Sequence, residues 1–346
     1  MGYENENLGC GPFNTPRGQK MKRTILQIVF SLIVLAAVVS FADVGKVAEV
    51  IAGANLAYFA VALVFYFAIN AVMAYRIQMI LEYLGTKLEY KKILTSHFSG
   101  MLASDFTPAR SGYFATAAVL AKNHKVKSGE ALVSILGPQM FDFIYKLVAG
   151  GIGAWYLFSF VIVGAGENAG AGIVLGLLGL FGMVAFMALL LFSQRFLGMI
   201  SFAERLPFGG KALEMIGKMQ ENSHAISALT PHILVLIFIT WIFKAIEWWF
   251  IAMSLGVKPE IAFAPIIFWG FVQPIITLLQ FMPLPTIAGA GVSEAGAAFV
   301  LMQFGIGLPQ AIAFTLMTRF VMILVDSVGI VEGIGWIGGN KRKSQS

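Results

Sequence analysis

Several stretches of this chain run for about twenty residues with almost no charge, and this feature constrains the fold more than any other. A helix needs about 20 apolar residues to cross the hydrocarbon core of a membrane. Only 12% of the residues are charged, against about 25% in soluble domains. We therefore expect one integral membrane domain over residues 23–335. Residues 1–22 are expected to form a disordered cytoplasmic tail and residues 336–346 a basic cytoplasmic tail.

Six stretches have the length and composition of membrane-spanning helices. They are residues 24–42, 54–75, 129–163, 172–193, 231–253 and 309–333. Two further apolar regions, 93–121 and 261–304, are interrupted by proline and glycine, which break helices. The sequence thus predicts an all-α protein in which two apolar segments do not cross the membrane as simple helices.

The distribution of basic residues predicts the orientation. With both termini in the cytoplasm, 18 of the 24 Lys and Arg residues lie in cytoplasmic segments, among them Arg76, and only Lys46 and Lys258 lie outside. Since Lys and Arg gather on the cytoplasmic side, we expect a multi-pass protein of the cell (plasma) membrane with both termini inside. The net charge of +6 then reports membrane orientation, and no nucleic-acid partner is expected.

The region 93–121 has basic clusters on both sides. A single crossing would place one cluster outside, whereas a hairpin that enters the membrane and returns keeps both in the cytoplasm. The turn is expected between residues 105 and 112, with Pro108 and Gly112. The clusters are Lys87, Lys91 and Lys92 before the region, and Lys122, Lys125 and Lys127 after it.

By the same reasoning the region 261–304 is expected to enter from the outside. Its turn lies in the segment FMPLPTIAGAGVSEAG, residues 281–296. Pro285 ends one half-helix there, and Gly289 and Gly291 allow a tight turn. The sequence therefore predicts two re-entrant helical hairpins that enter from opposite faces.

A short repeat supports this arrangement. Residues 84–90, LGTKLEY, and residues 255–261, LGVKPEI, share the pattern L-G-x-K-x-E. Each copy follows a spanning helix and precedes a broken hairpin, so the chain divides into half-repeats at about 24–163 and 172–333. The first half starts inside and the second starts outside, which predicts an inverted-topology repeat of the kind found in secondary transporters.

Ionisable residues at membrane depth are costly and usually face the protein interior. The sequence places Asp105 and Arg110 on either side of the first turn. It also spaces two pairs for contact along a helix, Asp142 with Lys146 and Lys244 with Glu247. These pairs are either structural ion pairs or part of a substrate site.

Three charged residues have no opposite charge three or four residues away in the sequence. They are Arg110, which was named above, Glu294 and Arg319. The planar guanidinium of arginine is suited to bidentate binding of phosphate, so we expect Arg110 and Arg319 to bind substrate. Glu294 either binds substrate or is an acid stabilised at a helix N-terminus, with Ser293 as the N-cap. Asp326 lies seven residues after Arg319 and so shares its helix face.

Signatures of enzyme chemistry are weak. One cysteine, Cys10, excludes a disulfide within the chain, and no Walker motif is present. No metal, cofactor or catalytic residue is expected. The amphipathic segment 195–224 is either an interfacial helix pair or a linker. The four histidines are scattered without metal-ligand spacing: His97, His124, His224 and His232.

Four segments resemble the flippase-like family known from the transmembrane region of lysylphosphatidylglycerol synthases. These are YRIQMILEYLG (75–85), PARSG (108–112), PLPTIAGAGVSEAG (283–296) and FGIGLPQAIAFTLMTRF (304–320). The family pattern of Pro, Gly-rich turn, Glu and a helix carrying Arg falls on Pro285, Gly289, Gly291, Glu294 and Arg319. The acidic residue that usually follows the first turn of the family is absent from PARSGYFATA.

The resemblance implies movement of a lipid between leaflets. We therefore expect a flippase or scramblase-like transporter of a phospholipid or polyprenyl-phosphate-type lipid, without the aminoacyltransferase domain of the synthases. The alternatives are an ion-coupled small-solute transporter of the inverted-repeat type and an intramembrane lipid-modifying enzyme. Besides membrane lipids, the expected partners are further copies of the chain or a separate lipid-synthesising enzyme.

Overall fold

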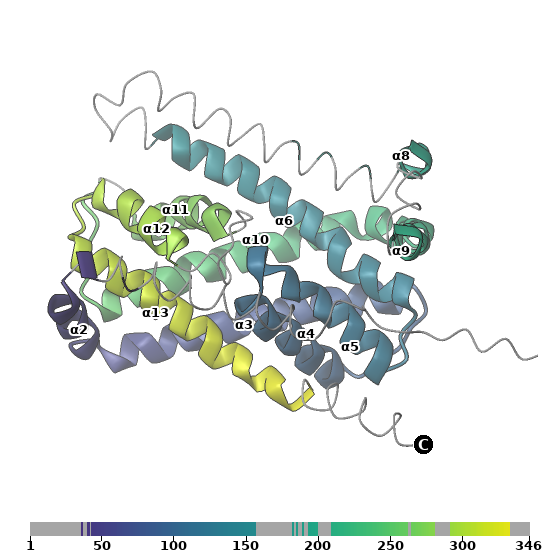
Figure 1. Ribbon diagram of the computed structural model, residues 1–346, viewed down its shortest axis with the longest axis horizontal. Coiled ribbons are helices and arrows are strands. Elements are labelled where there is room, and N and C mark those ends of the chain that lie inside the picture. The colour runs from purple at the N-terminus through teal and green to yellow at the C-terminus, as the bar shows by residue number, and fades with distance from the viewer. Residues whose placement is uncertain are drawn as a thin grey trace, which may run out of the picture.

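The computed structural model describes residues 43–156, 193–199, 209–261, 264–280 and 291–332, together with single positions at 36, 40, 41, 182, 185 and 189. The regular structure in these residues is entirely helical (Figure 1). Nearly all of the predicted spans 24–42 and 172–193 lies outside the described residues. So does the centre of the second turn, residues 281–290, with Pro285 and Gly289.

Four described helices are long and apolar enough to cross a membrane. At 1.5 Å per residue, even the shortest of these spans, the 25 residues Leu308–Glu332, is about 37 Å long and exceeds the roughly 30 Å of a hydrocarbon core. The chain is therefore a multi-pass membrane protein. The helices are α3 (Leu56–Tyr83), α6 (Ser128–Tyr156), α10 (His224–Ser254) and α13 (Leu308–Asp326), which the 3₁₀ turn η5 (Ser327–Gly329) continues.

Two of these helices extend beyond their predicted bounds. α3 does not end at residue 75 but continues through Arg76, which is buried and paired with an acid of another helix. α10 begins at His224 and contains Pro231, which was expected to mark its start. Membrane helices tolerate an internal proline when the freed backbone groups are satisfied locally.

Helices α3 and α10 pack against each other in opposite directions. The backbone N–H of Asn55, just before α3, donates to the carbonyl of Ser254 at the end of α10 (2.7 Å). At the other end of the pair, the rings of Tyr83 and His224 lie 6.1 Å apart. The first long described helix of each half-repeat therefore runs antiparallel to its counterpart.

The repeated L-G-x-K-x-E pattern forms the same helix ending twice. Gly85 after α3 has φ 86° and Gly256 after α10 has φ 66°, a left-handed conformation that glycine adopts readily. The next N–H reaches back to the helix in both cases, from Thr86 to the carbonyl of Leu81 (2.9 Å) and from Val257 to that of Ala252 (2.8 Å). These are Schellman caps, and the shared sequence pattern therefore has a shared structural role.

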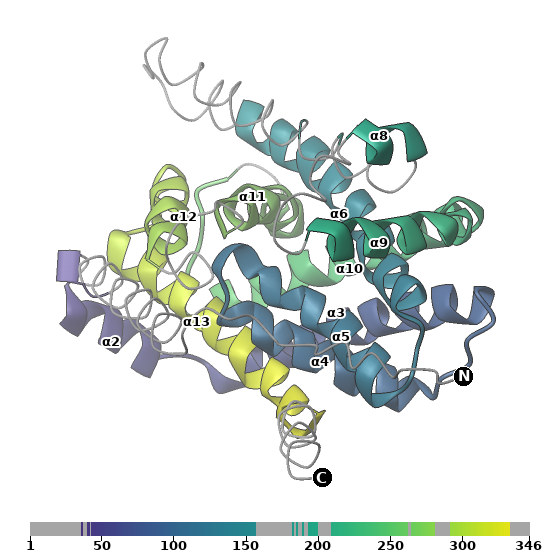
Figure 2. The same cartoon turned by 45° about the vertical axis from the view of Figure 1, so that its right-hand side comes forward.

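The long helices α3 and α10 are each followed by a unit of short helices. The first unit contains α4 (Tyr90–Asp105), η1 (Pro108–Phe114) and α5 (Ala115–Asn123). The second contains α11 (Pro265–Gln280) and α12 (Val292–Met302). At 16 residues, α4 and α11 are about 24 Å long, too short to cross a membrane alone. In both views the first unit lies toward the end of the molecule that holds α9, and the second toward the end that holds α2 (Figures 1 and 2).

The last long helix of each half packs against the short unit of the other half. A Cβ added to Gly153 of α6 would lie 2.8 Å from the carbonyl oxygen of Phe271 in α11, and one added to Gly329 in η5 would lie 2.2 Å from the backbone nitrogen of Ser99 in α4. Small residues permit such close backbone approach between membrane helices. The two halves are therefore interlocked by matching contacts.

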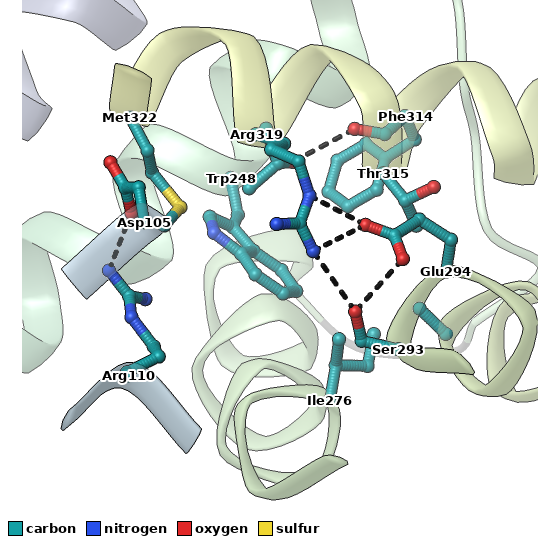
Figure 3. A pocket seen from close by; sticks show the side chains of 12 residues that line it. Asp105, Arg110, Trp248, Ile276, Ser293, Glu294, Phe314, Thr315, Arg319 and Met322 are labelled. Carbon is teal, nitrogen blue, oxygen red and sulfur yellow. Dashed lines mark hydrogen bonds and ion pairs between the residues drawn. The ribbon is translucent and has the colours of Figure 1, made fainter. Parts of the chain in front are cut away.

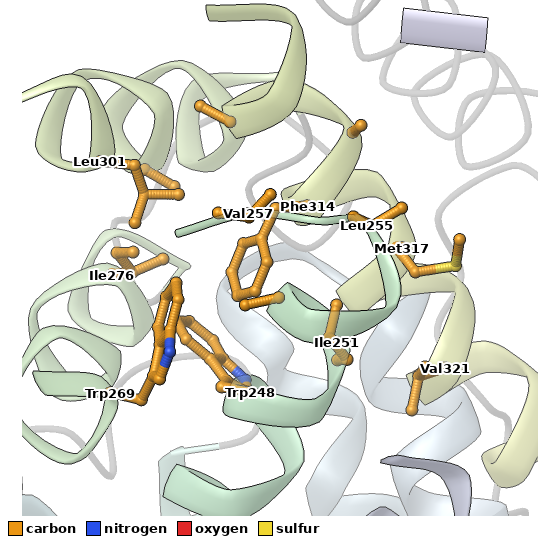
Figure 4. Close-up of a cluster of buried hydrophobic side chains, with 14 of the residues drawn as sticks. Trp248, Ile251, Leu255, Val257, Trp269, Ile276, Leu301, Phe314, Met317 and Val321 are labelled. Carbon is orange, nitrogen blue, oxygen red and sulfur yellow. The ribbon is translucent and has the colours of Figure 1, made fainter. Parts of the chain in front are cut away.

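The largest buried cluster joins α10, α11 and α13 (Figure 4). The ring of Phe314 stacks on Trp269 at a centroid distance of 4.7 Å and meets the edge of Trp248 at 5.4 Å. All three side chains are almost fully buried. This aromatic cluster forms one wall next to the charged residues described below.

Three shorter helices lie at the two ends. α2 (Val44–Ala52) is capped by Asp43, and the donation of the Lys46 backbone N–H to this carboxyl lowers the pKa of Asp43. α8 (Gln194–Met199) and α9 (Gly209–Glu221) fall in the segment expected to be an interfacial helix pair or a linker, and α9 packs against α6. The segment is thus helical where it is described.

Candidate functional site

The first short unit turns around Arg110. This residue has φ 54°, a conformation that costs a non-glycine residue about 1–3 kcal/mol and persists only when its surroundings hold it. Its Nη2 donates to Asp105 Oδ1 (3.1 Å) and its Nε to Ser104 Oγ (3.2 Å). Asp105 is only 4% exposed. The strained turn therefore directs a buried ion pair toward the protein interior.

Position 112, two residues after Arg110, requires glycine. A Cβ at Gly112 would lie 2.2 Å from the carbonyl carbon of Ala103 in α4. The N–H of Gly112 donates to Thr107 Oγ1 (2.6 Å), and Pro108 starts η1 in its first turn. These contacts bring the returning chain against the end of α4.

After the residues that are not described, the second short unit continues at Gly291, which has φ 88° and precedes α12. The prediction that Ser293 caps this helix is wrong: Gly291 is the N-cap, and Ser293 lies inside the first turn. Glu294 reaches back and accepts from the Gly291 N–H (2.6 Å) and the Ser293 hydroxyl (3.0 Å) through Oε2. A carboxylate in this position is also stabilised by the helix dipole.

Arg319 of α13 completes this group. Its Nε and Nη2 both contact Glu294 Oε1, at 2.7 Å and 2.6 Å, and Nη2 also donates to Ser293 Oγ (3.2 Å). Both carboxylate oxygens of Glu294 therefore accept two contacts each. The pair is largely buried, with 18% of the Arg319 side chain and 3% of the Glu294 side chain exposed.

The two ion pairs line one cavity (Figure 3). Asp105 and Arg110 lie on one side and Arg319, Glu294 and Ser293 on the other, with the Trp248 indole between them in this view. The cavity holds about 20 Å³, which is room for a water molecule but not for a lipid headgroup. Its remaining wall is formed by Ile276, Ala297, Phe314, Thr315, Thr318 and Met322.

Lys244 and Glu247 form the ion pair that their spacing on one helix allows. Lys244 Nζ lies 2.7 Å from Glu247 Oε2 and 4.7 Å from the centre of the Tyr66 ring. Glu247 is fully buried and precedes Trp248 in the cavity wall. The pair therefore lies beside the cavity and does not line it.

Asp142 forms an ion pair with an arginine of another helix. Its Oδ2 accepts from Nη2 of Arg76 at 3.0 Å, and the Arg76 side chain is only 2% exposed. Arg76 is therefore not a solvent-exposed loop residue, because a buried acid compensates its charge inside the protein. Lys146 lies within electrostatic reach of Asp142, Arg76 and Arg110, so this second group borders the first.

Two residues of the interior were not among the predicted site residues. The hydroxyl of Tyr66 in α3 donates to Asp326 Oδ2 at the end of α13 (2.9 Å), and Asp326 is fully buried. The sequence predicted that Asp326 lies on the same helix face as Arg319. No sequence pattern near Tyr66 indicates its contact with Asp326, because 260 residues separate the two partners.

Comparison with protein families gives one match. A family model described as the lysylphosphatidylglycerol synthase TM region matches residues 24–329. A comparison with curated proteins finds no match. The matched range contains both short helical units and all the charged residues described above.

Proposed function

Because this chain belongs to the family of the lysylphosphatidylglycerol synthase TM region, we propose that it moves a phospholipid or polyprenyl-phosphate-type lipid between the two leaflets. Membership of this family indicates a lipid-related membrane function. The flippase or scramblase-like activity is our inference from the family and from the buried charges.

One observation carries the proposal: two arginines from different halves of the chain face one buried cavity. Arg110 comes from the first short unit, and Arg319 lies on the helix that follows the second. Phosphate is the charged group that all the proposed lipids share, and the planar guanidinium binds it through two parallel hydrogen bonds. A phosphate that entered here would compete with Asp105 and Glu294 for partners that are already in place.

The cavity in this structure is closed to a headgroup. Its volume of about 20 Å³ is that of a site for one water. A lipid phosphate would enter only after one of the short helical units moved away. Short units that end inside the protein are suited to such movement, because only their contacts with neighbouring helices hold them.

We propose that the two short units are re-entrant hairpins of an inverted-topology repeat. The antiparallel packing of α3 and α10, the two matching helix caps and the placement of the units at opposite ends support this. Opposed hairpins that meet near the midplane would allow access from either leaflet in turn.

Lipid movement is tested by reconstitution into liposomes that carry a headgroup-labelled lipid. We expect an added membrane-impermeant quencher to bleach more label than in protein-free vesicles. A panel of lipids with and without a phosphate headgroup identifies the substrate class. If no lipid moves faster than in protein-free vesicles, the proposal is wrong, and ion-coupled solute uptake becomes the activity to test.

The double variant Glu294→Gln/Arg319→Gln addresses the site. It removes both charges and so leaves no unpaired charge in the interior. We expect it to fold and to lose transport. Phe320→Leu is the matched control, because Phe320 follows Arg319 on α13 but is 52% exposed. Equal transport by the double variant and the control would place the substrate elsewhere.

Further parts of the proposal follow from the same arrangement. We propose that the chain is a transporter without catalytic activity of its own, and that it lies in the plasma membrane with both termini in the cytoplasm. Its substrate would then come from a separate lipid-synthesising enzyme. Product formation by the purified protein from a lipid phosphate would contradict this.

A further inference from the structure

Among the described residues beside the cavity, one acid forms no ion pair. Three acids are each paired with a cation: Asp105 with Arg110, Glu247 with Lys244, and Glu294 with Arg319. The fourth, Asp326, is fully buried and accepts a hydrogen bond from the neutral hydroxyl of Tyr66. A buried carboxylate without a cation is costly in a low dielectric.

Asp326 lies next to another carboxyl group. Asp105 and Asp326, from α4 and the end of α13, are within hydrogen-bonding reach of each other. One oxygen on each, Asp105 Oδ2 and Asp326 Oδ1, is buried and accepts no hydrogen bond from any described residue. The other oxygen of each is occupied, by Arg110 and by Tyr66. Two adjacent acceptors therefore lack a donor.

We propose that Asp105 and Asp326 form a proton-binding site that holds one proton while Arg110 contacts Asp105, and that a second proton, taken up when Arg110 leaves, is the ion coupled to transport. A protonated carboxyl gains an O–H donor, so one proton supplies the missing hydrogen bond to the neighbouring acid. It also removes the uncompensated charge. Adjacent carboxyl groups that share a proton are a known solution to this arrangement.

The groups around the pair favour a proton over a metal cation. The described residues form no cluster of three or more metal-ligating side chains. The Arg110 guanidinium already contacts Asp105, so a further cation would meet a positive charge. The titratable and charged groups that act on the two acids come from α3, η1, α10 and α13, and they are Tyr66, Arg110, Lys244 and Arg319. Glu247 of α10 acts in turn on Tyr66.

The position of the pair suggests how a proton could be coupled to lipid movement. Asp105 lines the cavity, which has room for a water molecule, and its partner Arg110 is proposed to contact the lipid phosphate. If Arg110 leaves Asp105 for a phosphate, the pair loses its cation while it holds only one proton, and uptake of a second proton restores its neutrality. This coupling step depends on the proposed lipid transport, whereas the proton-binding site does not.

Proton binding is tested on the purified full chain without any lipid substrate. Infrared difference spectra between acidic and alkaline buffer should show the C=O stretch of a protonated carboxyl group in the wild type. We expect Asp326→Asn to lose this band. Glu49→Gln, which changes an exposed acid on α2, should keep it. Adding sodium chloride at fixed pH should leave the band unchanged.

Folding is followed in parallel, because the neutral amide of asparagine resembles the protonated acid. Asp326→Asn should be as stable as the wild type near neutral pH. A wild type without a titrating carboxyl band, a band retained by Asp326→Asn, or a band removed by sodium would each overturn the proton site.

Coupling is measured separately in liposomes with an imposed pH gradient. The wild type should move lipid faster with the gradient than without it, and Asp105→Asn should lose this response, because Asp105 is the acid that loses its cation. A carboxyl band without any lipid movement would retain the proton site and reject the proposed function. Lipid movement that does not respond to the gradient would reject the coupling.

Discussion

The ion pair between Glu294 and Arg319 should show strong energetic coupling in a double-mutant cycle. The cycle consists of Glu294→Gln, Arg319→Gln and the double variant, each compared with the wild type. Glutamine keeps hydrogen-bonding capacity at both positions and removes only the charges. The free energy of unfolding measured for the four proteins isolates the interaction of the two side chains.

The contacts predict unequal single effects. Removing one partner of a buried pair typically costs about 3–5 kcal/mol. After Arg319→Gln, Glu294 keeps the donors from Gly291 and Ser293 and its place at the start of α12, so we expect a loss of about 2 kcal/mol. After Glu294→Gln the Arg319 charge loses the acid that it contacts twice, and we expect about 3 kcal/mol.

The double variant distinguishes a coupled pair from two independent residues. Additive effects would sum to about 5 kcal/mol, whereas a coupled pair should lose only about 3 kcal/mol in the double variant. The coupling is then about 2 kcal/mol, or about 30-fold in the unfolding equilibrium constant. Unfolding of the purified protein by sodium dodecyl sulfate in mixed micelles, followed by tryptophan fluorescence, measures this difference.

An exposed pair provides the control. Lys218 and Glu214 on α9 are also ion-paired, but about half of each side chain is exposed. Solvent and salt screen such pairs, so the same cycle there should give a much smaller coupling. Additive losses at Glu294 and Arg319, or coupling no larger than in the control, would refute the assignment of a buried ion pair.

The remaining predictions concern the turn and the topology. Gly112→Ala should prevent correct folding, because its Cβ would lie 2.2 Å from the Ala103 backbone. Gly210→Ala, where no atom lies within 4 Å, should be tolerated; yield of monodisperse protein in size-exclusion chromatography checks both. In a Cys10→Ser background, an impermeant maleimide added to whole cells should label Lys46→Cys but not Lys218→Cys, and the reverse pattern would refute the predicted orientation.

Much of the helical order could be predicted because it depends on local composition. Uninterrupted apolar stretches predicted α3, α6, α10 and α13, and proline and glycine predicted where the two apolar regions break. The bounds were less accurate where a tertiary contact decided them. Helix α3 continues through Arg76, whose charge is compensated by Asp142 of α6. No sequence pattern near Arg76 indicates this partner.

The partners of the buried charges were harder to predict than their positions. Spacing along a helix predicted the Lys244–Glu247 contact correctly. The same argument offered Lys146 as a partner for Asp142, whose short contact is instead with Arg76, 66 residues away. Ser293 was expected to cap α12, but the left-handed backbone of Gly291 moves the cap two residues upstream. Which ion-pair partner and which N-cap form depends on how the helices pack.

The pairing of the charges bears on how a transporter of this kind could work. A buried arginine waiting for phosphate would carry an uncompensated charge in the empty protein, which is costly. Here Arg110 and Arg319 are held by acids, so binding a phosphate would exchange one anionic partner for another. The released acid must then be neutralised, and uptake of a second proton by Asp105 and Asp326 can do this only for Asp105. Glu294 instead keeps the donors of α12 and its helix N-terminus. The two half-sites are therefore predicted to differ, with proton dependence confined to the first.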